Sequence, residues 1–354
     1  MSATALERGR PARVTGAAAW RLALGFVVLL GGTGLGLLSW RLGPWAPPGF
    51  AEQPLPTGGG VPAALALAPD GAVWFTLDNA NAIGVLRGGR IQRILKGREN
   101  LEPLGLAVAP DGGVWFTDAV AEAIGHLAPD GTLESFPLPT GITQFGRLAV
   151  ARDGAVWAAE SWSNKLIRLQ DGGFTPYPLS SANAAPFGIA ADPDGGIWAT
   201  LQVANKLVHV DANGEASEVE PPTRSSGPSD VAVDPSGAVW FVELRAGKIG
   251  RFANGQFSEF PLPNPQAGIT DLSVAPDGSI WFAELRAQKL GRLRGGVIDE
   301  FKLPRDDARP FGVRVAPDGS VWYTDLTGWL GRVPASDVGR TGLDLRRLLP
   351  WPHG

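Results

Sequence analysis

Seven tryptophans recur at an almost constant interval along this chain of 354 residues. Their separations are 41, 42, 41, 42, 41 and 41 residues, a period typical of four-stranded β-propeller blades. Each period contains a short apolar strand, a tight turn, a strand centred on tryptophan and two further strands. The repeat predicts an all-β fold, a seven-bladed β-propeller of four-stranded blades. The repeated residues are Trp74, Trp115, Trp157, Trp198, Trp240, Trp281 and Trp322.

A turn of the Pro-Asp-Gly type precedes nearly every one of these tryptophans, as in Pro276-Asp277-Gly278. Proline presets the first turn angle, aspartate accepts hydrogen bonds from local amides, and glycine adopts a positive φ. The period thus accounts for the 48 glycines and 31 prolines, a content that would otherwise indicate disorder. The chain has no cysteine, which excludes disulfides and thiolate metal sites. A formal net charge of -4 without a basic stripe argues against a nucleic-acid partner.

An apolar run near the N-terminus lies outside the repeat. The 17 residues from Leu22 to Leu38 are interrupted only by Thr33, and as a helix they would span about 25 Å. Tryptophans at both ends and four arginines on the N-terminal side favour a membrane helix that keeps this side in the cytoplasm. We therefore expect a cytoplasmic segment (1–21), a transmembrane signal-anchor (22–40), a linker (41–50), the propeller (51–333) and a C-terminal tail (334–354).

A cleaved signal peptide is the alternative interpretation of the same run. The sequence Gly49-Phe50-Ala51 has the small-x-small pattern of a cleavage site. It lies thirteen residues beyond Leu38, whereas cleavage normally follows the apolar core closely, so we favour the uncleaved anchor. The propeller is extracytoplasmic in both cases: it is held at the cell membrane by a single pass, or exported and soluble after cleavage.

The residues that follow the linker are expected to close the ring. The segment Pro54-Leu55-Pro56-Thr57-Gly58 nearly repeats Pro137-Leu138-Pro139-Thr140-Gly141, which ends the fourth strand of the second blade. Residues 51–55 are therefore predicted to pair with Trp329–Val333 as the outer strand of the seventh blade, covering an open edge. The competing candidate for this strand is Leu343–Leu349.

Charged residues interrupt the repeat consensus near the propeller axis. The position ten residues before tryptophan is glycine or alanine in four blades, but it is Arg147, Asp230 or Asp271 in the others. Eight residues before tryptophan, a series of alanines is broken by Arg314, which needs a carboxylate or a ligand as its partner. Because a ligand needs different groups in different blades, we predict that these four residues bind an unknown small molecule or protein at the channel mouth. Mutual neutralisation of their charges is the alternative.

Carboxylates occupy the position three residues after tryptophan in five of the seven blades. Clustered acids can bind a hard cation, so Glu243 and Glu284 are candidate ligands for magnesium or calcium, although a purely binding function requires no cofactor. Alternatively, the acids accept hydrogen bonds from loop amides or pair with Lys165, Lys248 and Lys289. The five acids are Asp118, Glu160, Glu243, Glu284 and Asp325.

The histidines offer no assembled general base. His126 and His209 fall eleven residues after tryptophan, on the expected third strands and away from the channel mouth, and His353 lies in the tail. The sequence contains no His-x-x-x-His pair, no serine-histidine-acid arrangement and no phosphate-binding loop.

The repeat units carry a family resemblance. Residues 109–118 and 274–284, together with 248–251 and 260–263, resemble the streptogramin B lyase (virginiamycin B lyase-like) family, and the resemblance extends over about residues 52–333. It implies a seven-bladed propeller that opens a cyclic depsipeptide antibiotic by magnesium-assisted elimination. It further implies a histidine base eleven residues before tryptophan and a metal-binding glutamate three residues after it, a position that Glu243 and Glu284 match.

The position of the base departs from the family pattern. Loss of a general base commonly costs a factor of about 100 or more in rate, so we expect a binding propeller rather than a lyase. A metal-assisted lyase, with Asp230 or Asp271 in place of the histidine, or a lactone hydrolase acting on a cyclic ester is the alternative. The seven positions carry Ala63, Leu104, Gly146, Phe187, Ser229, Thr270 and Phe311.

Overall fold

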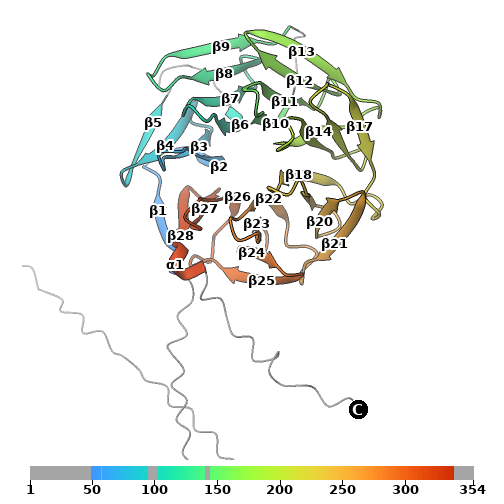
Figure 1. Cartoon of the computed structure of the whole chain (residues 1–354). Coiled ribbons are helices and arrows are strands. Elements are labelled where there is room, and N and C mark those ends of the chain that lie inside the picture. The colour runs from blue at the N-terminus through green and yellow to red at the C-terminus, as the bar shows by residue number, and fades with distance from the viewer. Residues whose placement is uncertain (1–48, 57, 95–102, 140–143, 339–354) are drawn as a thin grey trace, which may run out of the picture. The chain divides into compact units, whose positions relative to one another are not determined.

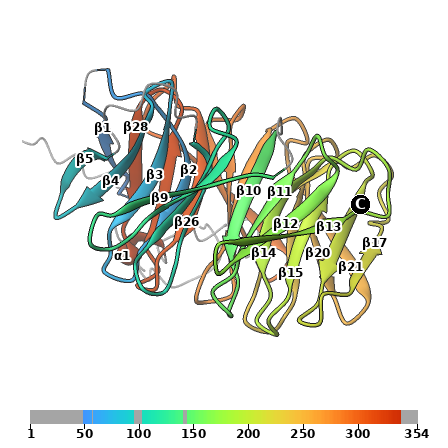
Figure 2. The same cartoon turned by 90° about the horizontal axis from the view of Figure 1, so that it is seen from above.

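Seven four-stranded antiparallel sheets surround a central axis in the computed structural model, which describes residues 49–56, 58–94, 103–139 and 144–338. The first strand of each blade lies nearest the axis and the fourth lies at the rim (Figure 1). Viewed from the side, the strands run across the thickness of the ring (Figure 2). The seven-bladed propeller predicted from the tryptophan period is confirmed.

The strands follow the repeat closely. Blade one comprises β2 (Val61–Leu67), β3 (Val73–Asp78), β4 (Ala82–Arg87) and β5 (Arg90–Ile94), and blade two comprises β6 (Pro103–Val108), β7 (Val114–Asp118), β8 (Ala123–Leu127) and β9 (Leu133–Pro137). Blade three comprises β10 (Phe145–Val150), β11 (Val156–Glu160), β12 (Lys165–Gln170) and β13 (Gly173–Pro178), and blade four comprises β14 (Pro186–Ala191), β15 (Ile197–Leu201), β16 (Lys206–Val210) and β17 (Ala216–Val219). Blade five comprises β18 (Pro228–Val233), β19 (Val239–Glu243), β20 (Lys248–Ala253) and β21 (Gln256–Pro261), and blade six comprises β22 (Ile269–Val274), β23 (Ile280–Glu284), β24 (Lys289–Arg294) and β25 (Val297–Lys302). Blade seven comprises β26 (Pro310–Val315), β27 (Val321–Asp325), β28 (Trp329–Val333) and β1 (Ala51–Pro54).

The ring closes through its N-terminal strand. Residues of β1 pair antiparallel with β28, from Ala51 opposite Arg332 to Pro54 opposite Trp329, which confirms the predicted closure. The carboxylate of Glu52 accepts a hydrogen bond of 2.8 Å from the hydroxyl of Tyr323 in the middle of the blade. The last described element is the short helix α1 (Ala335–Val338), and the competing segment 343–349 lies outside the described residues.

A tight hairpin joins the first and second strands of every blade, and we call the side of the ring that carries these turns the hairpin face. In blade six, Asp277 accepts a hydrogen bond from the amide of Ser279, and Gly278 has a φ of 78°. This is the left-handed conformation that the turn requires of glycine.

Packing inside each blade depends on the residue after tryptophan. Five blades have an aromatic ring there, opposite a glycine of the third strand: a Cβ added to Gly291 would lie 2.0 Å from the ring of Phe282. In the third blade, Ala158 instead faces Ile167, and in the fourth Ala199 faces Val208. A large side chain on one strand is thus matched by a small one on its neighbour, which keeps the core filled.

No helix among the described residues is long and apolar enough to cross a membrane. The expected signal-anchor at residues 22–40 lies outside the described part of the chain.

Candidate functional site

The first strands approach one another so closely around the axis that most blades allow only a small residue ten positions before tryptophan. A Cβ added to Gly188 would lie 2.7 Å from the Cα atom of Asp230 in the next blade. In these small-residue blades the backbone amide donates to a threonine hydroxyl of the second strand, as from Gly105 to Thr117 at 2.7 Å. The same bond occurs from Ala64 to Thr76, from Gly188 to Thr200 and from Gly312 to Thr324.

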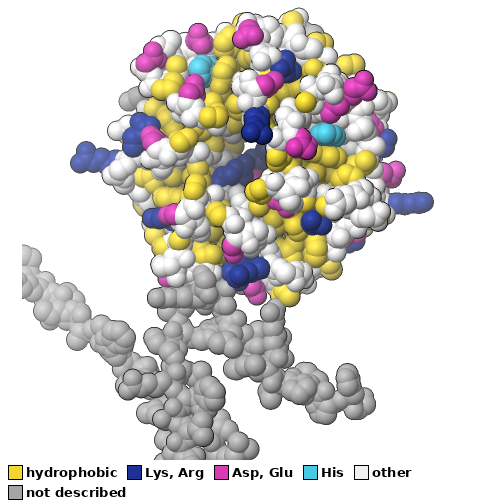
Figure 3. All heavy atoms as spheres, viewed as in Figure 1, with side chains coloured by type: hydrophobic (Ala, Val, Ile, Leu, Met, Phe, Trp, Pro, Cys, Tyr) yellow, Lys and Arg dark blue, Asp and Glu magenta, His cyan; other side chains and the backbone are white. Residues whose placement is uncertain are grey.

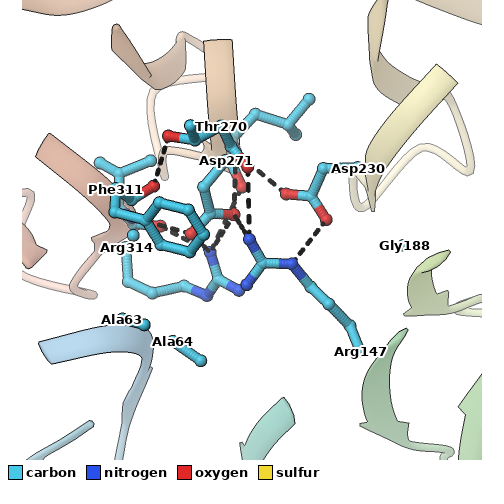
Figure 4. Close-up of polar contacts among 12 residues, drawn as sticks. Ala63, Ala64, Arg147, Gly188, Asp230, Thr270, Asp271, Phe311 and Arg314 are labelled. Carbon is cyan, nitrogen blue, oxygen red and sulfur yellow. Dashed lines mark hydrogen bonds and ion pairs between the residues drawn. The ribbon is translucent and has the colours of Figure 1, made fainter. Parts of the chain in front are cut away.

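The other three blades carry Arg147, Asp230 and Asp271 at this position, and these side chains meet Arg314 of blade seven at the axis. Arg147, Asp230, Asp271 and Arg314 form what we call the Arg–Asp cluster (Figure 4). Nη1 of Arg314 lies 2.8 Å from both carboxylate oxygens of Asp271, and Nε of Arg147 lies 3.3 Å from Oδ1 of Asp230. The cluster therefore brings together all four residues that were predicted from the sequence to bind a ligand.

Backbone groups tie the Arg–Asp cluster to the strands around it. Asp271 accepts a hydrogen bond of 2.8 Å from the amide of Val313, and Asp230 accepts one of 3.2 Å from the amide of Leu272. The guanidinium of Arg147 donates to the carbonyl of Thr270 across the channel. Asp271 is fully buried, and the cluster links blades three, five, six and seven.

The two carboxyl groups of the cluster have opposite electrostatic environments. Burial alone would raise the pKa of Asp271, but the guanidinium groups of Arg147 and Arg314 outweigh this effect and lower the pKa to about 2. Burial raises the pKa of Asp230 well above its usual range, because Arg147 offsets only part of this effect and the charge of Asp271 adds to it. Pairing of opposite charges, the alternative to ligand binding in the sequence analysis, is therefore strongest between Asp271 and the two arginines.

A cavity of about 440 Å³ occupies the channel next to the cluster. Its wall consists mainly of alanine, valine and leucine side chains from the first strands, with Ser273 and Arg314 as its polar side chains. The lining residues lie seven to nine positions before tryptophan, so the cavity belongs to the half of the channel nearer the hairpin face. Figure 3 shows basic side chains inside the hollow at the centre of the ring.

The candidate metal ligands lie at the end of the second strand that is farther from the hairpin face. Glu243 and Glu284 are fully buried, and burial raises the pKa of each carboxyl group to about 7, with a further increase from Glu259 and Glu300 respectively. The described residues contain no group of three or more histidine, cysteine, aspartate or glutamate side chains that could hold a metal ion.

The alternative expectation was that the acids three residues after tryptophan pair with nearby lysines or accept hydrogen bonds from loop amides. The structure shows such bonds in some blades but not in all. Glu160 pairs with Lys165 at 3.0 Å, and Asp118 accepts hydrogen bonds from the loop amides of Val120 and Ala121. In blade five, however, the ion pair of Lys248 is with Glu259 on the fourth strand, at 2.6 Å. Lys289 likewise pairs with Glu300.

The two described histidines lie on third strands, as expected. His126 stacks on Trp115 with ring centroids 4.0 Å apart, and His209 stacks on Trp198 at 4.5 Å. Both rings lie two strands away from the first strands that carry the Arg–Asp cluster. His353 lies outside the described residues.

Comparison with known proteins agrees with this architecture. A model of the virginiamycin B lyase family matches residues 48–333. The chain belongs to this family. Similar solved structures include a catalytically inactive histidine-to-alanine variant of virginiamycin B lyase from Staphylococcus aureus with quinupristin, at 27% identity and a TM-score of 0.76 over 80% of this chain and 98% of that one. A streptogramin B lyase structure has 29% identity and a TM-score of 0.76 over 80% of this chain and 97% of that one.

More distant likenesses concern the fold alone. The hydrazine synthase of Kuenenia stuttgartiensis has 15% identity and a TM-score of 0.63 over 78% of this chain and 96% of that one. No curated protein sequence matches the chain.

Within this virginiamycin B lyase family propeller, sequence reasoning overlooked two features of the axis. Ser273 occupies the alanine position of blade six and lines the cavity beside Arg314. The threonine two residues after tryptophan is present in the four blades that have glycine or alanine ten positions before it, and absent from the other three. A comparison of these two positions across the seven blades would have shown that the threonine is lost wherever the glycine or alanine is replaced by a charged residue.

Proposed function

We propose that this member of the virginiamycin B lyase family is a membrane-anchored, extracytoplasmic propeller that binds a ligand in its axial channel through the Arg–Asp cluster. The observation that carries the proposal is the meeting of four off-consensus charged residues beside a cavity. Buried ion pairs pay a desolvation penalty that well-packed apolar residues avoid. A cluster that spans four blades is therefore better explained by recognition than by stability alone.

Binding at the cavity can be tested by isothermal titration calorimetry with three planar probes that differ in charge: benzoate, benzamide and benzamidine. We expect at least one probe to bind the full-length chain at one site per molecule. The variant Ala149→Leu places a larger side chain in the cavity wall and should abolish that binding. Failure of all three probes, or binding that persists in Ala149→Leu, would contradict a ligand site in the channel.

The membrane anchor rests on the apolar run, its flanking tryptophans and the four arginines that precede it. The described chain begins at Gly49, whose amide donates to Asp337 of α1, and Ala51 pairs with Arg332 near the hairpin face. The first described residues therefore lie at the hairpin side of the propeller.

Fractionation of bacterial cells that express the full-length chain tests this arrangement. We expect the protein in membranes that have been washed with alkaline carbonate, and we expect protease added to spheroplasts to degrade the propeller. A soluble periplasmic product that lacks the first 51 residues would instead establish signal cleavage. Recovery in the cytoplasm would contradict export.

A metal-assisted lyase or lactone hydrolase acting on a cyclic ester is the second candidate function, because the family match is accompanied by Glu243 and Glu284. A carboxyl group whose pKa is about 7 is suited to proton transfer at neutral pH. A metal site would need ligands beyond these two, and no step is assigned to magnesium because the described residues supply no group of three. Asp230 or Asp271 would have to replace the histidine base.

Turnover distinguishes the two candidates. The full-length chain is titrated with magnesium, calcium and manganese in a calorimeter, and then incubated with quinupristin while mass spectrometry follows ring opening. Ring opening that requires magnesium and is lost in Glu284→Gln would establish the enzyme. Absence of both metal binding and turnover would exclude it and leave the binding proposal.

A further inference from the structure

The seven residues that lie eight positions before tryptophan differ in a way that gives the cavity one polar side. Five are alanines, whereas blades six and seven contribute Ser273 and Arg314. All seven line the cavity. Because β22 and β26 are the first strands of neighbouring blades, the two polar residues lie next to each other, and the amide of Val315 donates to Oγ of Ser273.

Arg314 uses only one end of its guanidinium within the Arg–Asp cluster. Nη1 contacts the carboxylate of Asp271 and also donates to the carbonyl of Val313 at 2.6 Å (Figure 4). Among the described residues, neither Nε nor Nη2 has a hydrogen-bond acceptor. These two nitrogens form the planar edge that binds both oxygens of a carboxylate in a bidentate pair. The Arg314 side chain is 29% exposed and lines the cavity.

Ser273 supplies a second hydrogen-bond donor on the same side of the cavity. Its hydroxyl oxygen already accepts the amide of Val315 at 3.1 Å. A serine hydroxyl can accept and donate at the same time, so its hydrogen remains for a ligand.

The position of Arg314 also favours an anion. Arg147 and Arg314 both face Asp271 and hold its pKa down to about 2, whereas burial raises the pKa of Asp230. Arg314 is the arginine of the cluster that lines the cavity. A partly buried guanidinium is stabilised by an anionic partner, which a ligand in the cavity would supply.

We infer that Arg314 and Ser273 form a carboxylate-binding subsite in the axial cavity, and that the ligand is a small monocarboxylate whose apolar body contacts the alanines of the other blades. This inference rests on the proposed function, because it names the chemical class of ligand that the channel binds. It adds that the ligand enters the cavity from the hairpin half of the channel and forms a bidentate pair with Arg314.

The charge series of benzoate, benzamide and benzamidine tests the inference, because the three probes share one planar shape. We expect benzoate to bind the full-length chain at least about tenfold more tightly than benzamide, since charge-assisted hydrogen bonds are stronger than neutral ones. Benzamidine should bind most weakly. Inorganic phosphate, titrated separately, should bind less tightly than benzoate because it has no apolar body.

Variants assign the preference to the two residues. Arg314→Gln should remove the advantage of benzoate over benzamide. Ser273→Ala should reduce it about threefold, because a hydroxyl donates a stronger hydrogen bond to a carboxylate than to a neutral amide. Arg294→Gln changes an exposed arginine at the end of β24 and should leave the preference unaltered. Circular dichroism of each variant verifies that the propeller remains folded. If Arg314→Gln does not fold, Ser273→Ala and Ala149→Leu still decide the site.

The outcomes separate this inference from the proposed function. Equal binding of benzoate and benzamide, both blocked by Ala149→Leu, would overturn the carboxylate subsite and leave an axial ligand site standing. A preference for benzoate that survives Arg314→Gln, or that is undiminished in Ser273→Ala, would also overturn it. Absence of binding by every probe would overturn both.

Discussion

Nη1 of Arg314 lies 2.8 Å from each carboxylate oxygen of Asp271, which belongs to the preceding blade. Arg147 approaches the same carboxylate from blade three, with Nη2 3.7 Å from Oδ1. One fully buried aspartate thus faces two arginines, and Asp230 is a second acidic partner of Arg147. The central position of Asp271 makes it the residue on which the cluster most depends.

Replacing Asp271 should destabilise the propeller substantially. Asp271→Asn leaves Arg147 and Arg314 without their shared counter-ion, and breaking a buried ion pair costs about 3–5 kcal/mol. Urea unfolding followed by tryptophan fluorescence measures the change. The control Asp70→Asn removes an exposed ion pair with Arg87 and should cost less than about 1 kcal/mol. Equal effects of the two variants would contradict the importance assigned to the cluster.

The buried glutamates predict a stability that falls as the pH rises. Since the pKa of Glu243 and Glu284 is raised from 4.5 to about 7, the folded chain retains a proton on each that the unfolded chain has already released. Their stabilising contribution is complete below pH 4.5 and is lost as the pH rises through 7, at about 1.4 kcal/mol per pH unit for each group.

Glu284→Gln should therefore flatten the pH dependence of unfolding free energy between pH 5 and 7 relative to the parent chain. Glu215→Gln, at an exposed position, provides the matched control and should leave the dependence unchanged. A parent chain and Glu284→Gln variant with parallel pH profiles would show that the carboxyl group titrates normally.

The match between Phe282 and Gly291 should be measurable as a compensating pair. Gly291→Ala alone forces a methyl group into the Phe282 ring and should cost about 1–3 kcal/mol, the usual range for overpacking. Combining Phe282→Ala with Gly291→Ile reproduces the alanine–isoleucine pair of blade three and should recover part of the loss caused by Phe282→Ala. A double-mutant cycle by urea unfolding measures the coupling; additive costs would disprove the volume exchange.

Ring closure should contribute through the bond between Glu52 and Tyr323. Glu52→Ala leaves a fully buried tyrosine hydroxyl without its acceptor, which should cost about 1–3 kcal/mol. In a Tyr323→Phe background the same substitution should cost less, since the hydroxyl is already gone. Thermal unfolding of the four chains measures the difference, and an undiminished cost would mean that the bond to Tyr323 contributes nothing to closure.

The local pattern of the sequence was enough to place most strands. The tryptophan period gives the blade number because each blade is built from local hairpins, and the repeated Pro-Leu-Pro segment identified β1 as the partner of β28. The four charged residues of the axis were likewise visible as departures from the repeat. Their partners were not, because Asp271 and Arg147 are more than a hundred residues apart and meet only when the ring forms.

By itself, then, the sequence determined the propeller, its closure and the identity of the charged residues near the axis, since these follow from spacing and from departures at single repeat positions. The tertiary structure decided which charges pair, which carboxyl groups have a raised pKa and which nitrogen of Arg314 contacts Asp271. The physical reason is that burial and distance between blades set these electrostatic properties. Both depend on the packing of seven first strands around one axis.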